Sequence, residues 1–186
     1  QIYNEIENNF IESKAKTLYK AFENSFSISY SDHFTAKIAC KDIAIINDLH
    51  KNSIPVIKLL KNGEKDKSVF SLKIYSKAEQ VYLSQIMPIL ENFGLSVVEE
   101  HTYKIRPIFD GKEEVFWLHN FKVIIDTVTC SNFDGIKHIF EDAIMDCWHG
   151  TTENDPLNKL VLSAEISSRN VSLIRAYTRF LKQTNF

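Results

Sequence analysis

The chain has 186 residues, of which 44% are hydrophobic and 25% are charged, proportions that are typical of globular proteins. Its formal net charge is -2, and its Lys and Arg residues are scattered, so we expect no nucleic-acid partner. No apolar run reaches the roughly 20 residues that cross a bilayer. We therefore expect a cytoplasmic protein with no membrane partner. The first residues resemble neither a signal peptide nor a natural start, which favours a piece of a longer protein.

Residues 2–26 contain no Gly or Pro and carry apolar side chains at helical spacing, which predicts a long amphipathic helix. Its two apolar stripes are Ile11, Ala15, Leu18 and Phe22, and Ile2, Ile6 and Phe10. Residues 26–35 are rich in Ser and Asp and predict a connector. Asp42 is then expected to cap a short helix that ends near Pro55.

The middle of the chain predicts four strands and one helix. Residues 54–60 and 70–75 are the first two strands, joined by a polar loop that contains Gly63. In the second strand, apolar residues alternate with Ser71, Lys73 and Tyr75, so we expect the latter three to face water. A helix over 84–93 ends at Gly94. Residues 95–106 and 115–126 then predict two long strands.

Three helices are expected at the end of the chain. Apolar residues between Ile136 and Trp148 recur every three or four positions, and Gly150 ends that helix. Pro156 suits the first position of a short second helix, and Ser168 is expected to cap the third. We expect one face of the third helix to be apolar and the opposite face basic. The apolar residues are Val171, Ile174, Thr178 and Leu181, and the basic ones are Arg175, Arg179 and Lys182.

The order helix, strand, strand, helix, strand, strand is a rotated form of the βαββαβ arrangement. The sequence therefore predicts an α+β fold of the ferredoxin-like (ACT-like) type, a four-stranded antiparallel sheet with helices on one face. The expected domains are an N-terminal helix and connector over 1–35, an ACT-like domain over 36–133 and a helical extension over 134–186.

The sequence offers little catalytic chemistry. Its five glycines are isolated, whereas a dinucleotide or nucleotide loop needs several close together. No two histidines are three or four residues apart, so no metal ligands are expected. His119 is read as a core histidine in preference to a catalytic base, and Cys40, Cys130 and Cys147 as reduced thiols. Neighbouring acids such as Glu141 and Asp142 are expected on solvated faces or in helix-end contacts.

One loop, residues 151–158, packs hydrogen-bonding side chains densely between two apolar helices. Its candidate residues are Glu153, Asn154, Asp155 and Asn158. Asp155 precedes Pro156 and can cap the next helix by accepting its free amide groups. The alternative is that the loop docks another part of the protein or binds a ligand.

Several strings of the sequence resemble the large bacterial NAD-specific glutamate dehydrogenases. They are LSQIMPILENFG (83–94), VVEE (97–100), WLHNF (117–121), FEDA (140–143), END with NKLVL (153–155, 158–162) and RAYTRFL (175–181). The resemblance implies a parent enzyme that converts glutamate to 2-oxoglutarate and ammonia with NAD. It also implies that hydride transfer occurs in another domain, because the family's cofactor loop and catalytic residues have no counterpart here. No catalytic, cofactor-binding or metal-binding residue is therefore assigned to this chain.

Two roles follow from this reading. The chain either positions the other domains and subunits of the parent enzyme in an oligomer, or acts as an ACT-like allosteric module that binds an amino-acid effector at the sheet edge. An independent enzyme is the third and least favoured reading.

Overall fold

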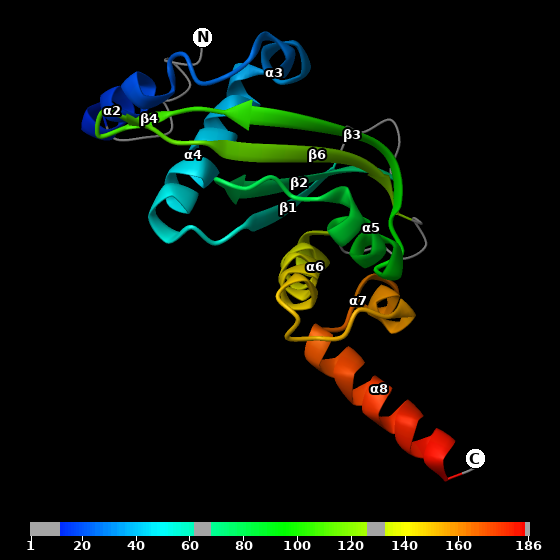
Figure 1. Ribbon diagram of the computed structural model, residues 1–186. Coiled ribbons are helices and arrows are strands. Elements are labelled where there is room, and N and C mark those ends of the chain that lie inside the picture. The colour runs from blue at the N-terminus through cyan, green and yellow to red at the C-terminus, as the bar shows by residue number, and fades with distance from the viewer. Residues whose placement is uncertain (1–11, 62–67, 126–132, 185–186) are drawn as a thin grey trace. The chain divides into compact units, whose positions relative to one another are not determined.

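The computed structural model describes residues 12–61, 68–125 and 133–184, with side chains described from Ala15 onward (Figure 1). The helices are α2 (Glu12–Phe22), α3 (Ile28–His33), α4 (Ala36–Asn52), α5 (Leu83–Asn92), α6 (Phe133–Trp148), α7 (Leu160–Ser163) and α8 (Ser168–Gln183), with a 3-10 helix at Pro156–Lys159. The strands are β1 (Val56–Lys61), β2 (Val69–Lys77), β3 (Ser96–Ile105), β4 (Ile108–Phe109), β5 (Lys112–Glu113) and β6 (Phe116–Ile124).

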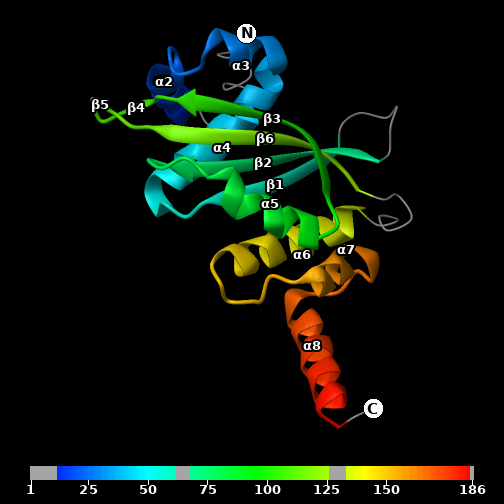
Figure 2. The same cartoon turned by 45° about the vertical axis from the view of Figure 1, so that its right-hand side comes forward.

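Four strands form one antiparallel sheet in the order β1-β2-β6-β3, which confirms the predicted α+β class and sheet. The strands β4 and β5 form a separate small hairpin, visible beyond β6 in Figure 2. If β1 is counted last, the order β2, α5, β3, β6, α6, β1 reads as β-α-β-β-α-β. The rotated ferredoxin-like arrangement is therefore present, with β1 and β3 at the two edges.

Strand β2 differs from its predicted alternation. Ser71, Lys73 and Tyr75 are buried together with the apolar residues between them, so the prediction that these three side chains face water is wrong. Ser71 donates a hydrogen bond to Asn120, and Tyr75 donates one to Asp42. Polar groups with such partners can be buried without large cost. Strand β2 is therefore buried from Phe70 to Ser76.

The chain folds as two compact units, each made of several segments. The first contains residues 1–56, 74–81 and 101–119, and the second contains residues 57–73, 82–100 and 120–186. They are described separately below.

The core of the first unit is built by apolar faces of α2 and α4 with strand residues. The predicted stripe on α2 is confirmed where it is described, since Ala15, Leu18 and Phe22 are buried. They belong to one cluster whose other members include Ile43, Ile46, Leu49, Tyr75, Tyr103, Ile105, Phe116 and Leu118. Aromatic rings extend this cluster, with the ring centroids of Phe26 and Tyr30 4.5 Å apart.

Two predictions for the first unit are wrong. The expected connector over 26–35 contains helix α3, because the hydroxyl of Ser27 accepts the backbone N–H of Tyr30 and caps that helix. The next helix begins at Ala36, so Asp42 lies inside α4 and is not its cap. Asp42 is 2% exposed and accepts hydrogen bonds from the hydroxyls of Tyr30 at 2.6 Å and Tyr75 at 2.7 Å. A buried carboxylate needs such donors.

The core of the second unit brings α5 and α6 against the strand segments of that unit. Phe133 of α6 stacks on Phe70 of β2 with ring centroids 5.2 Å apart, and Phe93 meets Phe140 edge to face. Gly94 follows α5 with φ +83°, the left-handed conformation expected there. Most of the apolar positions predicted for α6, such as Ile136 and Ile144, are buried, while Ile139 and Trp148 are half-buried.

Several predictions lie outside the described residues: the stripe residues Ile2, Ile6, Phe10 and Ile11, the loop residue Gly63, and Cys130. Within the described residues, no helix combines the length and the apolar character needed to span a membrane.

Candidate functional site

The candidate loop begins where α6 ends. Gly150, with φ +72°, reverses the chain, and the hydroxyl of Thr151 donates to the backbone oxygen of Asp146 at 2.7 Å. Asp155 then caps the 3-10 helix by accepting the backbone N–H of Leu157 at 3.0 Å, with Pro156 at the first position. The capping interpretation of Asp155 therefore agrees with the local geometry.

Arg175 of α8 is the main partner of this loop. Its Nε donates to Asp155 Oδ2 at 2.5 Å and its Nη2 to Asp155 Oδ1 at 3.0 Å, a two-pronged pair of high geometric specificity. Arg175 is 5% exposed, and its Nη2 also donates to Asn158 Oδ1 at 2.9 Å. The hydrogen bond from Arg175 holds the pKa of Asp155 below its ordinary value, and the same bond raises the pKa of Arg175.

Asn158 closes the loop on itself. It is buried, and its Nδ2 donates to the backbone oxygen of Glu153 at 3.0 Å. The same nitrogen lies 3.7 Å from the sulfur of Cys147 on α6. Burial raises the pKa of the Cys147 thiol, which favours the thiol over the thiolate at neutral pH.

The other two candidate residues make exposed contacts. Glu153 pairs with Arg179 of α8, and one of the two hydrogen bonds measures 2.9 Å. Asn154 accepts a hydrogen bond from Asn92 of α5 at 2.9 Å. All four candidate residues thus contact helices of their own unit. Together they form a joint between the loop and α5, α6 and α8, which we call the loop joint.

The sequence analysis did not identify the residues that contact the loop, which are Asn92, Cys147, Arg175 and Arg179. Arg175 and Arg179 are four residues apart and so share a face of α8, and Glu153 and Asp155 are two apart on the loop. This matched spacing of opposite charges was the available signal. Asn92 and Cys147 carried no comparable signal, because each reaches the loop only through the tertiary fold.

The predicted faces of α8 are also corrected. Val171 and Arg175 are its buried residues, although they were predicted to lie on opposite faces, and Ile174 and Leu181, which were predicted to share the face of Val171, are exposed. The N-cap is Ser167 and not Ser168, because the Ser167 hydroxyl accepts the Asn170 backbone N–H. The guanidinium of Arg175 can be buried because it donates hydrogen bonds to Asp155 and Asn158.

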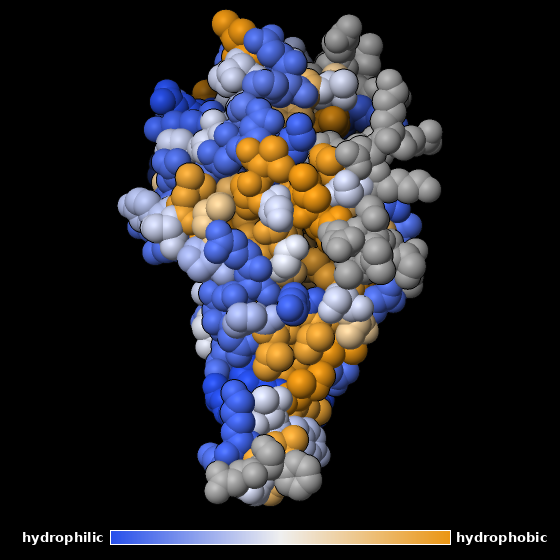
Figure 3. All heavy atoms as spheres, turned by 90° about the vertical axis from the view of Figure 1, so that its right-hand side faces the viewer, coloured by the Kyte–Doolittle hydropathy of each residue, from blue (hydrophilic) through white to orange (hydrophobic). Residues whose placement is uncertain are grey.

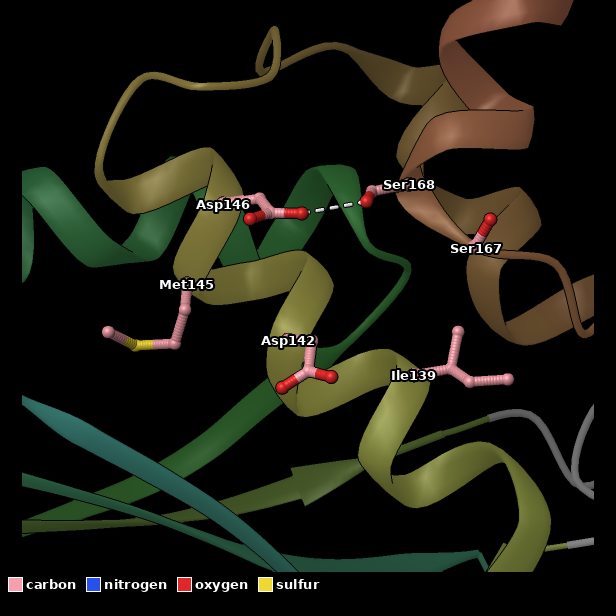
Figure 4. Close-up of a pocket in the computed structure, with 6 residues that line it drawn as sticks. All are labelled: Ile139, Asp142, Met145, Asp146, Ser167 and Ser168. Atoms are coloured by element: carbon pink, nitrogen blue, oxygen red, sulfur yellow. Dashed lines mark hydrogen bonds between the residues drawn. The ribbon is translucent and has the colours of Figure 1, made fainter.

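A hollow of about 450 Å³ lies between α6 and the start of α8. It is lined by Ile139, Asp142, Met145, Asp146, Ser167 and Ser168 (Figure 4). The Ser168 hydroxyl donates to Asp146 at 2.7 Å across it. One acid of this hollow is therefore already engaged in fixing the first turn of α8.

A second hollow, of about 350 Å³, lies in the first unit beside β3. Its lining includes the hydroxyl-bearing residues Ser25 and Ser27 and the basic residues Lys104 and Arg106. The backbone N–H of Arg106 donates to the backbone oxygen of Ser25 at 3.2 Å. Hydroxyls and cations at one place suit a carboxylate.

Among the residues that the structure describes, no three His, Cys, Asp or Glu side chains are grouped to hold a metal ion. His119, expected in the core, is buried at 1% exposure, with its Nδ1 3.1 Å from the hydroxyl of Thr102.

Comparison with known proteins identifies three similar regions in order. Residues 6–49 match the family model for helical motif 2 of glutamate dehydrogenase, residues 55–136 its ACT3 domain, and residues 152–186 its helical motif 3. Together these ranges cover most of the chain.

Three relatives named NAD-specific glutamate dehydrogenase are similar over nearly the whole chain. The protein of Halomonas elongata is 30% identical over 95% of the chain, and that of Pseudomonas aeruginosa 30% identical over 94%. The protein of Mycobacterium tuberculosis is 32% identical over 87%. These regions amount to 11%, 11% and 10% of the relatives, so the chain spans about a tenth of their length.

Proposed function

The chain belongs to the family of NAD-specific glutamate dehydrogenases, and on that premise we propose that it is a non-catalytic structural and regulatory segment of such an enzyme. In this proposal the whole protein oxidises glutamate to 2-oxoglutarate and ammonia with NAD. The chain positions the other domains and subunits of that oligomeric cytoplasmic enzyme.

The loop joint is the observation that carries this proposal. The densest group of polar side chains in the candidate region is occupied by contacts within the fold, above all the two hydrogen bonds between Arg175 and Asp155. Groups that are engaged in this way hold α8 against the loop, and Asp155 and Glu153 are both taken up by arginines. A helix α8 that is held in this way is suited to a segment that positions other domains or subunits of the enzyme.

The assignment of NAD to another part of the enzyme rests on the glycines. Gly94, Gly111 and Gly150 have positive φ, but each stands far from the others in the sequence. A pyrophosphate needs several backbone N–H groups converging at a glycine-rich turn and a helix start. In this proposal, residues 1–35 form the N-terminal helix and connector, 36–133 the ACT-like domain and 134–186 the helical extension.

The test uses the whole enzyme and the isolated chain. The chain alone should give no NAD-dependent oxidation of glutamate, and measurable turnover by it would contradict the proposal. In the whole enzyme, Arg175→Ala should lower activity or shift the oligomer seen by light scattering, whereas the exposed Arg179→Ala should do so much less. Affinity for NAD should be the same in both variants, because the proposal places the cofactor in another part of the enzyme.

The second hollow favours an alternative, an amino-acid-binding regulatory role. Lys104 and Arg106 would receive the α-carboxylate of an effector at edge strand β3, beside the hydroxyls of Ser25 and Ser27. Calorimetric titration with each common amino acid tests this role. It predicts one binder whose affinity falls in Arg106→Ala and is retained in Lys182→Ala, and no heat with any of them would contradict it.

A further inference from the structure

Two surface features lie outside the proposed function. Figure 3 shows hydrophobic residues gathered along one side of helix α8, but these residues are exposed in the described chain and nothing there identifies what would cover them. The other feature is the β4–β5 hairpin of the first unit, which together with its flanking residues, 107–115, is here called the arm. Figures 1 and 2 both show the arm beside α2.

The arm is too short to be stable by itself. Its two strands have two residues each, and they are joined by Asp110 and Gly111, which have φ of +50° and +78°. Positive φ at both central residues is the conformation of a tight hairpin turn. Because isolated hairpins are at best marginally stable in water, the position of the arm depends on its contacts with the rest of the unit.

Those contacts converge on His50, in the last turn of α4. The ring of Phe109 stacks on the imidazole of His50, with centroids 4.0 Å apart and planes at 18°. Phe109 also meets the rings of Phe22 and Phe116 edge to face. At the other end of the arm, Glu114 Oε2 lies 3.0 Å from His50 Nδ1. Both strands of the arm are therefore anchored to the same histidine.

Lys77 of β2 completes the charged cluster. Its Nζ lies 2.9 Å from Glu114 Oε2 and donates to the backbone oxygen of His50 at 3.1 Å. Partial burial would raise the pKa of Glu114, but the hydrogen bonds from His50 and Lys77 outweigh it and lower that pKa. Glu114 therefore keeps its charge at pH values where a histidine gains or loses its own. The other charged residues of the arm and those described on α2 are exposed, namely Asp110, Lys112, Glu113, Lys16 and Lys20.

The contacts of His50 favour its charged form. A charged imidazole makes a stronger hydrogen bond to the carboxylate of Glu114, and a cation over the face of Phe109 is attracted by the ring. The C-terminal end of α4 carries partial negative charge, which favours a cation in the last turn. The like charge of Lys77 opposes these three effects, but Lys77 is itself paired with Glu114. The arm should thus be held more tightly when His50 is charged.

From this geometry we propose that the arm is a pH-responsive element, which α4 holds closely while His50 is protonated and releases more often once His50 is neutral. The additional hold is present at pH values below the range in which histidine titrates and is lost as the pH rises through that range. The connection between β3 and β6 then has two states whose populations shift with pH.

Hydrogen–deuterium exchange in the whole enzyme measures how often the arm opens. The reporting peptides cover residues 106–115 and Ala78, whose backbone N–H donates to the backbone oxygen of Val115 at 2.8 Å. Each rate is divided by the intrinsic rate at the same pH, so that only the opening remains. From about pH 5.5 to about pH 8, protection should fall by about fivefold, the size expected for a partly exposed charge pair. Equal protection at the two pH values, or higher protection at the upper one, would overturn the proposal.

Charge variants assign the response to its source. His50→Gln keeps a donor for Glu114 without a charge, so its protection should be the same at both pH values. Glu114→Gln keeps an oxygen acceptor and should reduce the change to less than about twofold. Lys77→Met removes the opposing cation and should enlarge the change. A smaller change in Lys77→Met, or an undiminished one in Glu114→Gln, would contradict the cluster of charges assigned here.

The matched control is His33→Gln, which removes an exposed histidine of α3 in the same unit. His33 lies 2.7 Å from the hydroxyl of Tyr103, so this variant should keep the response of the wild type. A response that persists in His50→Gln, or one that is lost in His33→Gln, would overturn the proposal. The exchange readout requires neither glutamate turnover nor NAD, so this proposal and the proposed function can fail separately.

Discussion

Leu59 and Glu141 are joined by a hydrogen bond of 2.9 Å in which a backbone amide of strand β1 donates to a carboxylate of helix α6. Strand β1 is an edge of the sheet, and edge strands carry unpaired amides that can recruit other chains. Glu141 is 4% exposed and also accepts a hydrogen bond from Lys58 at 2.8 Å. The carboxylate therefore blocks this edge, and the expectation that Glu141 lies on a solvated face is wrong.

We predict that Glu141→Ala lowers the free energy of unfolding by about 2–3 kcal/mol, because it leaves the Leu59 amide and Lys58 without their acceptor. Glu141→Gln keeps an acceptor for the amide and should cost less. Urea unfolding measures both. The control is Glu99→Ala, since the pair of Glu99 with Lys122 is exposed and should contribute less than about 1 kcal/mol. Equal losses in Glu141→Ala and Glu99→Ala would show that the contact at the edge of β1 stabilises the fold no more than an exposed ion pair does.

Arg175 and Arg179 provide a matched pair on one helix. Arg175→Ala removes the two hydrogen bonds to Asp155 and the one to Asn158, so we expect a loss of about 2–3 kcal/mol in unfolding free energy. Arg179→Ala removes an exposed pair with Glu153 and should cost less than about 1 kcal/mol. Denaturant titration of the chain checks this order, which a larger loss in Arg179→Ala would contradict.

Stability should depend on pH through Asp155. Its pKa is lowered in the folded chain by the hydrogen bond from Arg175, while the unfolded value is about 3.9. The contribution of the carboxylate is therefore complete above about pH 5 and is lost as the pH falls through the lower, folded pKa. Unfolding free energies of the wild type and Asp155→Asn should differ by about 1–2 kcal/mol at pH 7 and converge toward pH 3. A constant difference over this range would rule out the linkage.

The buried Asp42 makes a further prediction. Burial, followed by the charge of Asp42, raises the pKa of Tyr30 above its ordinary value, so its phenol stays protonated and donates. Tyr75→Phe deletes the second donor to the same carboxylate and should destabilise the chain by about 1–3 kcal/mol. The exposed Tyr82→Phe should change stability by less than about 0.5 kcal/mol. Thermal unfolding monitored by circular dichroism compares the two, and an unchanged midpoint in Tyr75→Phe would contradict the role assigned to this network.

Local patterns in the sequence predicted the strands, most helices and the turn at Gly94, because these depend on periodicity and on conformations that neighbouring residues impose. The position of Asp42 could not be predicted in this way. Its partners lie 12 and 33 residues away, so only the tertiary fold makes a core position acceptable for it. A carboxylate before an apolar run looks like a cap when those donors are unknown.

At the candidate site too, local features could be predicted from the sequence and tertiary contacts could not. The loop residues and the cap at Asp155 followed from local composition, whereas the division of α8 into an apolar face and an opposite basic face did not predict which residues are buried. That rule fails when a charged side chain finds partners inside the fold, as Arg175 does with Asp155, 20 residues away. The apolar residues of α8 then remain outside.

The way α8 is attached has a thermodynamic consequence. Val171 is the one apolar residue among its buried positions, and Arg175 and Arg179 add ion pairs to Asp155 and Glu153. Heat capacity changes mainly with apolar surface exposed to water, so release of α8 from the loop joint should carry a small heat-capacity change. The free energy of this attachment should then change almost linearly with temperature, without the curvature that apolar burial produces. Added salt, which weakens the exposed Glu153–Arg179 pair, should loosen this attachment.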